Sequence, residues 1–337
     1  MSMARGNEND IRMWRRAVLA GVAVVLGLAS STAFGQAVDQ SIYVEEAGLI
    51  TYNSVEARRG DIPVSVAYFR ADGTHPEMYW TRLEPSPGQY DFSPFINALE
   101  EGRRKGIKVG IRIITANPHG RIFPGWIKSR TASKEGRTGI APDWDDPAVQ
   151  QSIRNLLVAL GNRVKNHPAF LFCDIAALGW AGEWTTEWNM FRDADFMPTI
   201  ESQRRYVDFH VEAFGAEKLV ANLDMPIEIL AYSMSLGVNG WRQDGFGNFI
   251  KSMSDYPPAF RDVPALWDVS GPRFFEIWGS NINEWPNQLV PWPIDQIFDE
   301  ALKYRATMFA NMGSPIPTQY VAAYKRFQRA MIDYAAK

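Results

Sequence analysis

Glu183 stands out because it follows a stretch that is typical of a buried strand. Residues 170–175, Phe-Leu-Phe-Cys-Asp-Ile, form a mostly apolar run with aromatic and β-branched side chains, the pattern of a strand buried on both faces. Small residues follow, and Glu183 then lies between Trp180 and Trp184. A carboxylate at such a position is either paired with a cation or used in catalysis. The flanking aromatics favour a flat, partly apolar ligand such as a sugar ring, and the alternative is a surface glutamate after a core strand.

Four other charged residues lie at or just beyond predicted strand ends, the acids Asp244 and Glu276 and the arginines Arg70 and Arg112. Two carboxylates that flank a bond are the machinery of glycoside hydrolysis, since one protonates the leaving oxygen and the other attacks or activates water. Glu183 and Glu276 are 93 residues apart, which is about three helix–strand units. The arginines would bind substrate hydroxyls or a uronate carboxylate, or would equally pair with the acids.

Tryptophan is abundant, with 12 residues in a chain of 337. Sugar rings stack their C–H faces on indole, so a concentration of tryptophans near predicted strand ends indicates a carbohydrate site. Any single tryptophan is as readily explained by core packing. The predicted substrate-binding tryptophans are Trp80, Trp180, Trp184, Trp241 and Trp278.

Other kinds of chemistry find little support in the sequence. The histidines are scattered at His75, His119, His167 and His210, without the spacing of metal ligands. Neither a phosphate-binding loop nor a nucleophile elbow is present. Cys173 is the single cysteine and lies in an apolar run, as a small core residue does. We therefore expect no metal and no cofactor.

The charge balance gives no reason to expect nucleic acid as a partner. The chain is 46% hydrophobic and 22% charged, with a formal net charge of −3. A basic surface for nucleic acid or for an anionic membrane is not indicated. The composition is that of a globular protein with a large core, and a carbohydrate is the expected partner.

Residues 1–35 have the pattern of a secretory signal. Arg12, Arg15 and Arg16 precede an apolar run over residues 17–29, and small residues follow up to position 35. The apolar run has 13 residues, fewer than a membrane-spanning helix needs, although a short membrane anchor is the alternative. We expect cleavage before Gln36, a secreted or periplasmic location, and no membrane contact by the mature chain.

Strands and helices alternate along the rest of the sequence, which predicts a parallel sheet with helical crossovers. The predicted strands cover residues 62–70, 79–83, 107–114, 170–175, 219–223, 237–244, 274–278 and 307–311. The predicted helices cover residues 93–105, 147–164, 200–214 and 293–305, with a further helix at the C-terminus. Residues 41–60 show no clear period, and 115–146 form a long loop. Eight strands favour a single α/β domain over residues 36–337, a (β/α)8 TIM barrel with its active site at the carboxyl ends of the strands.

A resemblance to a known group of enzymes agrees with this. Residues 79–92, Tyr-Trp-Thr-Arg-Leu-Glu-Pro-Ser-Pro-Gly-Gln-Tyr-Asp-Phe, resemble the W-x-x-L-E-P-x-x-G-x-Y-D-F segment of barrel glycoside hydrolases of the β-galactosidase kind. Over residues 45–320 the chain more closely resembles bacterial glycosidase-like barrels that carry the domain of unknown function DUF4832. The matching segments are 179–184, 241–247, 274–276 and 311–317.

The resemblance implies retaining hydrolysis of a poly- or oligosaccharide. Glu183 would be the acid/base at the fourth strand and Glu276 the nucleophile at the seventh. The retaining superfamily usually has Asn directly before its acid/base, and this chain has Gly182 there. Two alternatives are a glycosidase that uses Asp244 as one of its acids and a carbohydrate-binding barrel without catalysis.

The two glutamates should also differ in protonation. Glu183 lies between indoles after apolar residues, which disfavours its charge and raises its pKa. Glu276 would be kept ionised by an arginine, with Arg112 or Arg242 as the candidates. That difference is what an acid and a nucleophile require.

Overall fold

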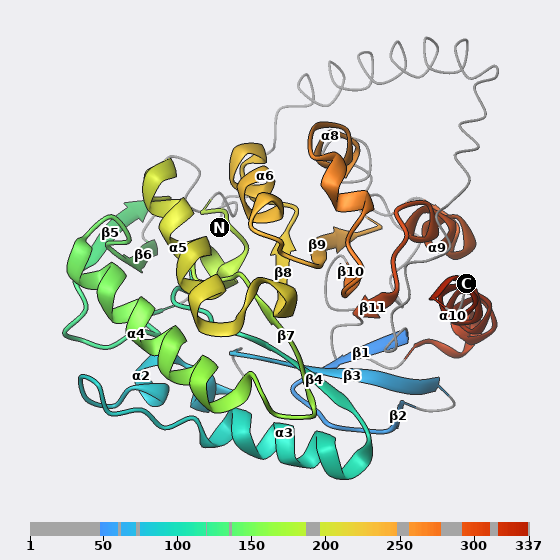
Figure 1. The fold of residues 1–337 in the computed structure, drawn as a ribbon, viewed down its shortest axis with the longest axis horizontal. Helices are drawn as coiled ribbons and strands as arrows, with labels where there is room; N and C mark the ends of the chain where they lie inside the picture. Colours follow the sequence, from blue (N-terminus) through green and yellow to red (C-terminus); the bar gives the residue numbers. More distant parts are fainter. Residues whose placement is uncertain are drawn as a thin grey trace, which may run out of the picture. The chain divides into compact units, whose positions relative to one another are not determined.

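Eight parallel strands close into a barrel in the computed structural model (Figure 1). They are β1 (Gly48–Tyr52), β3 (Ile62–Arg70), β4 (Lys108–Arg112), β7 (Phe170–Asp174), β8 (Leu219–Asn222), β9 (Trp241–Phe246), β10 (Arg273–Ile277) and β11 (Met308–Ala310). Each strand pairs in parallel with the next, and β11 pairs with β1 to complete the ring. The predicted (β/α)8 TIM barrel is confirmed.

The structure describes residues 48–59, 62–71, 75–118, 120–134, 137–186, 196–247, 256–277, 292–310 and 316–335. All of them belong to the unit Gln40–Lys337. The predicted signal segment, His119 and Trp278 lie outside the described residues.

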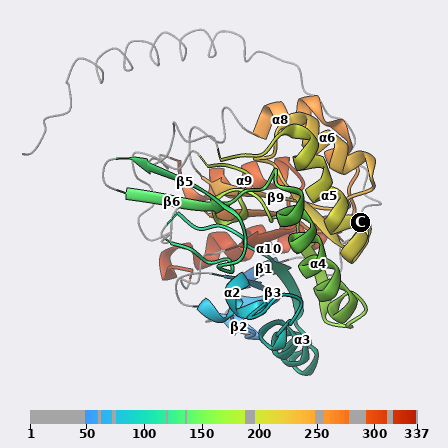
Figure 2. The same cartoon turned by 90° about the vertical axis from the view of Figure 1, so that its left-hand side faces the viewer.

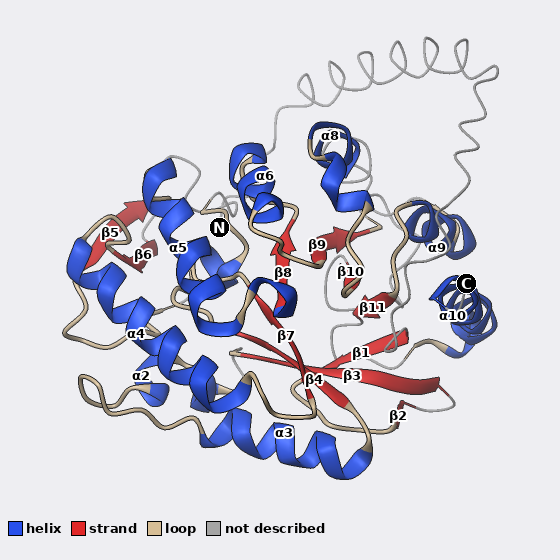
Figure 3. Ribbon diagram, viewed as in Figure 1, coloured by secondary structure: helices blue, strands red, loops and turns tan. Residues whose placement is uncertain are grey.

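Helices follow seven of the barrel strands in the described part of the chain (Figure 3). They are α3 (Ser93–Lys105), α4 (Pro147–Val164), α5 (Ile200–Phe214), α6 (Ile227–Ser235), α8 (Tyr256–Asp262), α9 (Ile294–Lys303) and α10 (Val321–Ala335). The connection from β1 to β3 carries instead the short strand β2 (Arg58–Arg59), antiparallel to β3. Short 3-10 helices lie at Pro76–Met78 (η1), Trp180–Gly182 (η2), Ala216–Lys218 (η3), Pro264–Trp267 (η4) and Thr318–Tyr320 (η6). None of the helices found in the described ranges is long and apolar enough to cross a membrane.

Local sequence signals explain several helix boundaries. The Asp146 side chain accepts hydrogen bonds from the backbone N–H groups of Ala148 and Val149, and Pro147 occupies the first turn of α4. Gly106 ends α3 in the left-handed conformation, with φ of 68°. Both boundaries agree with the sequence-based prediction.

Two sequence-based assignments were wrong. Residues 79–83, predicted as a strand, contain the short helix α2 (Trp80–Leu83). Glu84 holds this turn, since its carboxylate accepts hydrogen bonds from the Trp80 indole N–H at 2.7 Å and from the Gly88 backbone N–H at 2.8 Å. The strand that completes the barrel is β1, in a region where no element was predicted.

The long segment after β4 is not a simple loop. It contains an antiparallel hairpin formed by β5 (Ser129–Lys134) and β6 (Arg137–Pro142). Figure 2 shows this hairpin projecting from the barrel.

Aromatic side chains fill the interior of the barrel. The rings of Tyr68, Phe172 and Phe274 come from non-adjacent strands, yet their centroids lie 5.4 to 5.8 Å apart. Rings from such strands meet only across the barrel. A side chain at Gly110 on β4 would overlap the Phe172 ring, so glycine is needed there. A second, larger apolar layer lies between the strands and the helices.

Candidate active site

A row of charged side chains lies one layer above the aromatic interior, at the carboxyl ends of the strands. Arg70 on β3 is in register with Arg112 on β4, which is in register with Asp174 on β7. Residues in register on parallel strands point to the same face. Because Arg70 and Asp174 each follow an inward-facing aromatic residue by two positions, the row points into the barrel.

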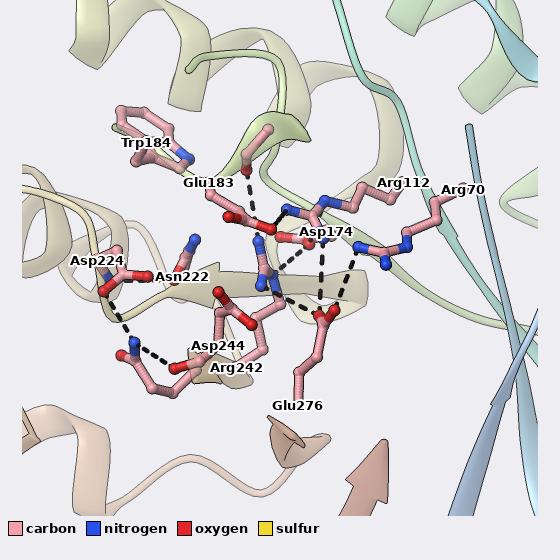
Figure 4. Close-up of polar contacts among 12 residues, drawn as sticks. Arg70, Arg112, Asp174, Glu183, Trp184, Asn222, Asp224, Arg242, Asp244 and Glu276 are labelled. Atoms are coloured by element: carbon pink, nitrogen blue, oxygen red, sulfur yellow. Dashed lines mark hydrogen bonds and ion pairs between the residues drawn. The ribbon is translucent and has the colours of Figure 1, made fainter. Parts of the chain in front are cut away.

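Glu276 on β10 is surrounded by three arginines (Figure 4). Its carboxylate lies 3.2 Å from Nη1 of Arg70, 3.8 Å from Nη1 of Arg112 and 3.6 Å from Nη1 of Arg242. The glutamate is 1% exposed, and its ion pairs are therefore shielded from water. The candidate partners predicted from the sequence, Arg112 and Arg242, are both present, and Arg70 joins them.

Asp174 holds two of these arginines from the other side. Its Oδ2 atom lies 2.5 Å from Nε of Arg242 and 3.4 Å from Nε of Arg112, and it accepts a hydrogen bond from the Tyr68 hydroxyl at 2.6 Å. The Nη1 groups of both arginines are thereby left for Glu276. Nη2 of Arg242 donates to the backbone oxygen of Gly182 at 3.4 Å. Sequence analysis missed Asp174, although an acid in a run predicted to be buried needs a cation, which is the argument applied to Glu183.

Glu183 reaches the same cluster from the segment that follows β7. Its Oε1 atom lies 3.5 Å from Nη2 of Arg112. One guanidinium group therefore contacts both glutamates, and the two carboxyls predicted to work as a pair are brought together. This is the central feature of the site.

The backbone before and after Glu183 is tightly folded. Ala181 and Trp184 have positive φ angles, 52° and 57°, which side-chain-bearing residues rarely adopt. Gly182 has φ of 74°, and a Cβ atom there would overlap the carbonyl oxygen of Ala176. Only glycine fits directly before Glu183, which explains why this position has no asparagine. Strained backbone that fixes one side chain is common at functional sites.

Two of the tryptophans that were predicted to stack on a sugar, Trp180 and Trp184, are packing residues. Trp180 and Trp184 are buried, and their indole N–H groups donate to the backbone oxygens of Thr186 and Ile175 at 3.1 and 2.6 Å. They hold the Glu183 segment in place but expose no ring face.

Trp80 and Trp241 are also fully buried, so their predicted contact with substrate is corrected. The Trp80 indole is bound to Glu84, and Trp241 packs against Phe260 and Phe275 in the layer beneath the helices. For Trp241 the physical reason is the alternation of side chains along a strand: Trp241 directly precedes the inward-facing Arg242 and must therefore point outward.

The two glutamates have opposite electrostatic environments. Burial and, after it, the neighbouring Asp244 carboxylate raise the pKa of Glu183 to about 8, although Arg112 acts in the opposite direction. Burial would also raise the pKa of Glu276, but Arg70, Arg112 and Arg242, with help from Tyr52, outweigh it and lower that pKa. The arrangement provides a carboxylic acid that can donate a proton and a carboxylate that can attack. The predicted difference between the two residues is confirmed in direction.

A second group of polar residues lies on β9 and at the end of β8 and just beyond it. Gln243 donates to the Asp224 carboxylate at 2.8 Å and to the backbone oxygen of Asp244 at 3.0 Å. Asn222 accepts a hydrogen bond from the Asp224 backbone N–H at 3.0 Å. Of these, only Asp244 was predicted from the sequence. Within the described ranges, no three His, Cys, Asp or Glu side chains are grouped so as to hold a metal ion.

Comparison with known proteins supports the fold. No protein-family model matches the sequence, and no curated protein matches it. Among solved structures, the endo-β-1,4-xylanase of glycoside hydrolase family 10 from Gloeophyllum trabeum has a TM-score of 0.54 at 11% identity, over 87% of this chain and 98% of that chain. Xylanase 10B from Thermotoga maritima has a TM-score of 0.52 at 11% identity, over 87% and 97%.

A β-galactosidase from the psychrophilic Marinomonas ef1 has a TM-score of 0.50 at 12% identity. The match covers 84% of this chain but only 58% of the β-galactosidase. At these identities the likeness shows the TIM-barrel fold alone, and the chemistry must be argued from the residues of this chain.

Proposed function

We propose that this protein is a glycoside hydrolase that cleaves a poly- or oligosaccharide by a retaining mechanism. Glu183 is the acid/base and Glu276 the nucleophile. The observation that carries the proposal is the pair of carboxyls on Arg112, one with its pKa raised to about 8 and the other with its pKa lowered.

The proposed reaction has two steps. Protonated Glu183 donates its proton to the leaving oxygen while the Glu276 carboxylate attacks the anomeric carbon, so that the glycosidic bond breaks and a glycosyl-enzyme forms. Glu183, now ionised, takes a proton from water, whose oxygen attacks the anomeric carbon and releases Glu276. The three arginines keep Glu276 ionised for the attack.

The sequence resemblance supports the same proposal in finer detail. Segment 79–92 resembles barrel glycoside hydrolases of the β-galactosidase kind, and segment 179–184 resembles the DUF4832 barrels; both resemblances imply a carbohydrate substrate. Residues 1–35 support export, and hence action outside the cytoplasm or in the periplasm. N-terminal sequencing of the exported protein should find Gln36 first, whereas a retained leader in the membrane would contradict cleavage.

A second candidate function is a carbohydrate-binding barrel without catalysis. The observation that favours it is the burial of Glu276 among three arginines, which a purely structural ion-pair network would also produce. The third possibility, Asp244 as one of the catalytic acids, follows from its position beside Glu183.

The test is a screen of the purified protein on polysaccharides and aryl glycosides. The matched control is the double variant Glu183→Gln/Glu276→Gln, purified in the same way, so that contaminating activity is recognised. The proposal requires turnover by the parent alone, with NMR showing the same anomeric configuration in the first product as in the substrate. Binding without turnover would support the second candidate, and an inverted product would rule out the retaining mechanism.

A further inference from the structure

Asn222 has a buried hydrogen-bond donor that the described residues do not satisfy. It is the last residue of β8, is fully buried and lies in register with Arg242. Its Oδ1 atom accepts from the Asp224 N–H at 3.0 Å, and this bond fixes which end of the amide is the nitrogen. The Nδ2 group has no hydrogen-bond partner in the described part of the protein. In Figure 4 this nitrogen is directed toward the side of the site where Glu183 lies.

An unpaired amide donor is unusual in a buried position, because nearly all buried polar groups find partners. The other unsatisfied nitrogens of the site belong largely to Arg112 and Arg242, which are held by ion pairs with carboxylates. Asn222 is neutral and has no such compensation. Its N–H group is therefore a neutral donor at the site that the described residues leave without a hydrogen bond.

We propose that Asn222 binds a neutral hydroxyl of the sugar ring next to the bond that is cleaved. This inference rests on the proposed function. The side chain is held at the carboxyl end of the strand next to β7, on the side from which Glu183 approaches. A hydroxyl suits it because an amide N–H donates to a neutral oxygen acceptor.

The surrounding charges define the substituent further. Asp224 is bound to Asn222 through its backbone, and Asp244 lies two residues beyond Arg242 on the neighbouring strand. Carboxylates on both sides repel an anionic group such as a uronate carboxylate at this position. The proposed site therefore selects a sugar that carries a hydroxyl there.

The experiment compares a monodeoxy series of an aryl glycoside that the parent cleaves. With the parent, kcat/KM should fall about 100-fold on one analogue of the series, the one that lacks the hydroxyl bound by Asn222. Asn222→Ala should lose a similar factor on the complete sugar and show no further loss on that analogue, because the contact is already absent. A merely structural role would lower kcat/KM equally on every analogue and leave the discrimination intact, which would overturn the inference.

Two further variants make the result decisive. Asn222→Asp keeps the size of the side chain and the acceptor for the Asp224 N–H but removes the donor, so it should lose the same discrimination even if Asn222→Ala fails to fold. Asn239→Ala makes the same chemical change before β9, where Asn239 accepts from Ser270, and should leave kcat/KM unchanged. Loss of discrimination in Asn239→Ala would overturn the assignment to Asn222.

Failure of the proposed function would be seen separately. A parent that cleaves no glycoside contradicts that function, and saturation-transfer NMR with the same sugars then decides on Asn222. Weaker binding of the complete sugar by Asn222→Asp would support the inference, and equal binding by parent and variant would overturn it.

Discussion

Neighbouring residues on one barrel strand serve two different regions of this protein. On β9, Trp241 points to the layer beneath the helices, where it packs against Phe275, whereas Arg242 points into the barrel and contacts Asp174. On β10, Phe275 belongs to the outer layer and Glu276 to the charged cluster. A single step along a strand thus separates core packing from candidate chemistry, because side chains alternate between the faces.

The two regions are stabilised by different forces. The outer layer, which is the apolar layer between the strands and the helices, is stabilised by the burial of apolar area. The inner cluster buries charges, which is costly unless ion pairs and hydrogen bonds compensate, and replacing such a network by apolar side chains often stabilises a protein. A buried cluster of this kind is therefore better explained by function than by stability. The predictions below test that contrast.

The largest effect is expected at Glu276. Glu276→Gln keeps the size of the side chain but removes the nucleophile, and turnover of every substrate should fall by about 10⁴-fold or more. The same change at Glu201, which is exposed on α5 and paired with Arg205, should leave turnover unchanged. Steady-state kinetics measure both, with circular dichroism as the check that each variant is folded. Normal turnover in folded Glu276→Gln would make Asp244 the first alternative nucleophile.

Glu183 should show a substrate-dependent loss. Glu183→Ala lacks the proton donor, so substrates with poor leaving groups should lose about 10²- to 10⁴-fold, while activated aryl glycosides need little protonation and should be spared. Azide should restore part of the rate by attacking the glycosyl-enzyme, which appears as a glycosyl azide product. Equal losses on good and poor leaving groups, with no azide product, would rule out the acid/base role.

Substitutions in the outer layer should lower the stability of the protein and not act on the chemistry. Trp241→Ala leaves a large cavity and should lower the free energy of unfolding by about 3–5 kcal/mol. Trp126, which is 45% exposed, provides the control. Trp126→Ala should change the free energy of unfolding by less than about 0.5 kcal/mol. Denaturant unfolding gives both values. A folded Trp241→Ala of parental stability that has lost sugar affinity would restore the original stacking prediction.

The fold was predictable from the sequence because helical and strand periods alternate. The predicted number of strands was right only because one missed strand and one wrongly predicted strand cancelled. Strand β1 was missed because its five residues, Gly48–Tyr52, are all buried and give no alternating pattern, while Gly48 and Thr51 interrupt the kind of apolar run by which residues 170–175 were identified. The aromatic segment 79–83 was counted in its place. What makes that segment a helical turn is a set of side-chain bonds from Glu84, and such contacts have no signature in a hydrophobic period.

The site was predictable where charge marks a strand end, as at Glu183 and Glu276. The tryptophans were wrongly assigned to the sugar site because an indole near a strand end can point to either face of the sheet. For Trp241, alternation along the strand relative to Arg242 would have predicted a side chain that points away from the barrel interior. Asn222 gave no signal at all, since a neutral amide becomes informative only when its bonding partners are known.

The smallest effect is expected at Asp244, and it concerns pH. The acid must be protonated to donate, so kcat/KM should fall as the pH rises through the pKa of Glu183, about 8. After burial, the Asp244 carboxylate is the next cause of that raised pKa. Asp244→Asn removes the negative charge, lowers the pKa of Glu183 and should move the alkaline limb of the profile to lower pH. At pH 8 the loss of rate should be roughly twofold to tenfold.

The acidic limb provides an internal reference for this variant. It reports protonation of Glu276, whose pKa is lowered by the three arginines, and it should stay in place. The same charge change at the exposed Asp268 should move neither limb. If Asp244→Asn instead abolishes turnover at every pH, Asp244 takes part in the reaction itself and the assignment of roles between it and Glu183 must be reversed. A shift of the alkaline limb alone would mean that Asp244 acts on the reaction through its charge on Glu183.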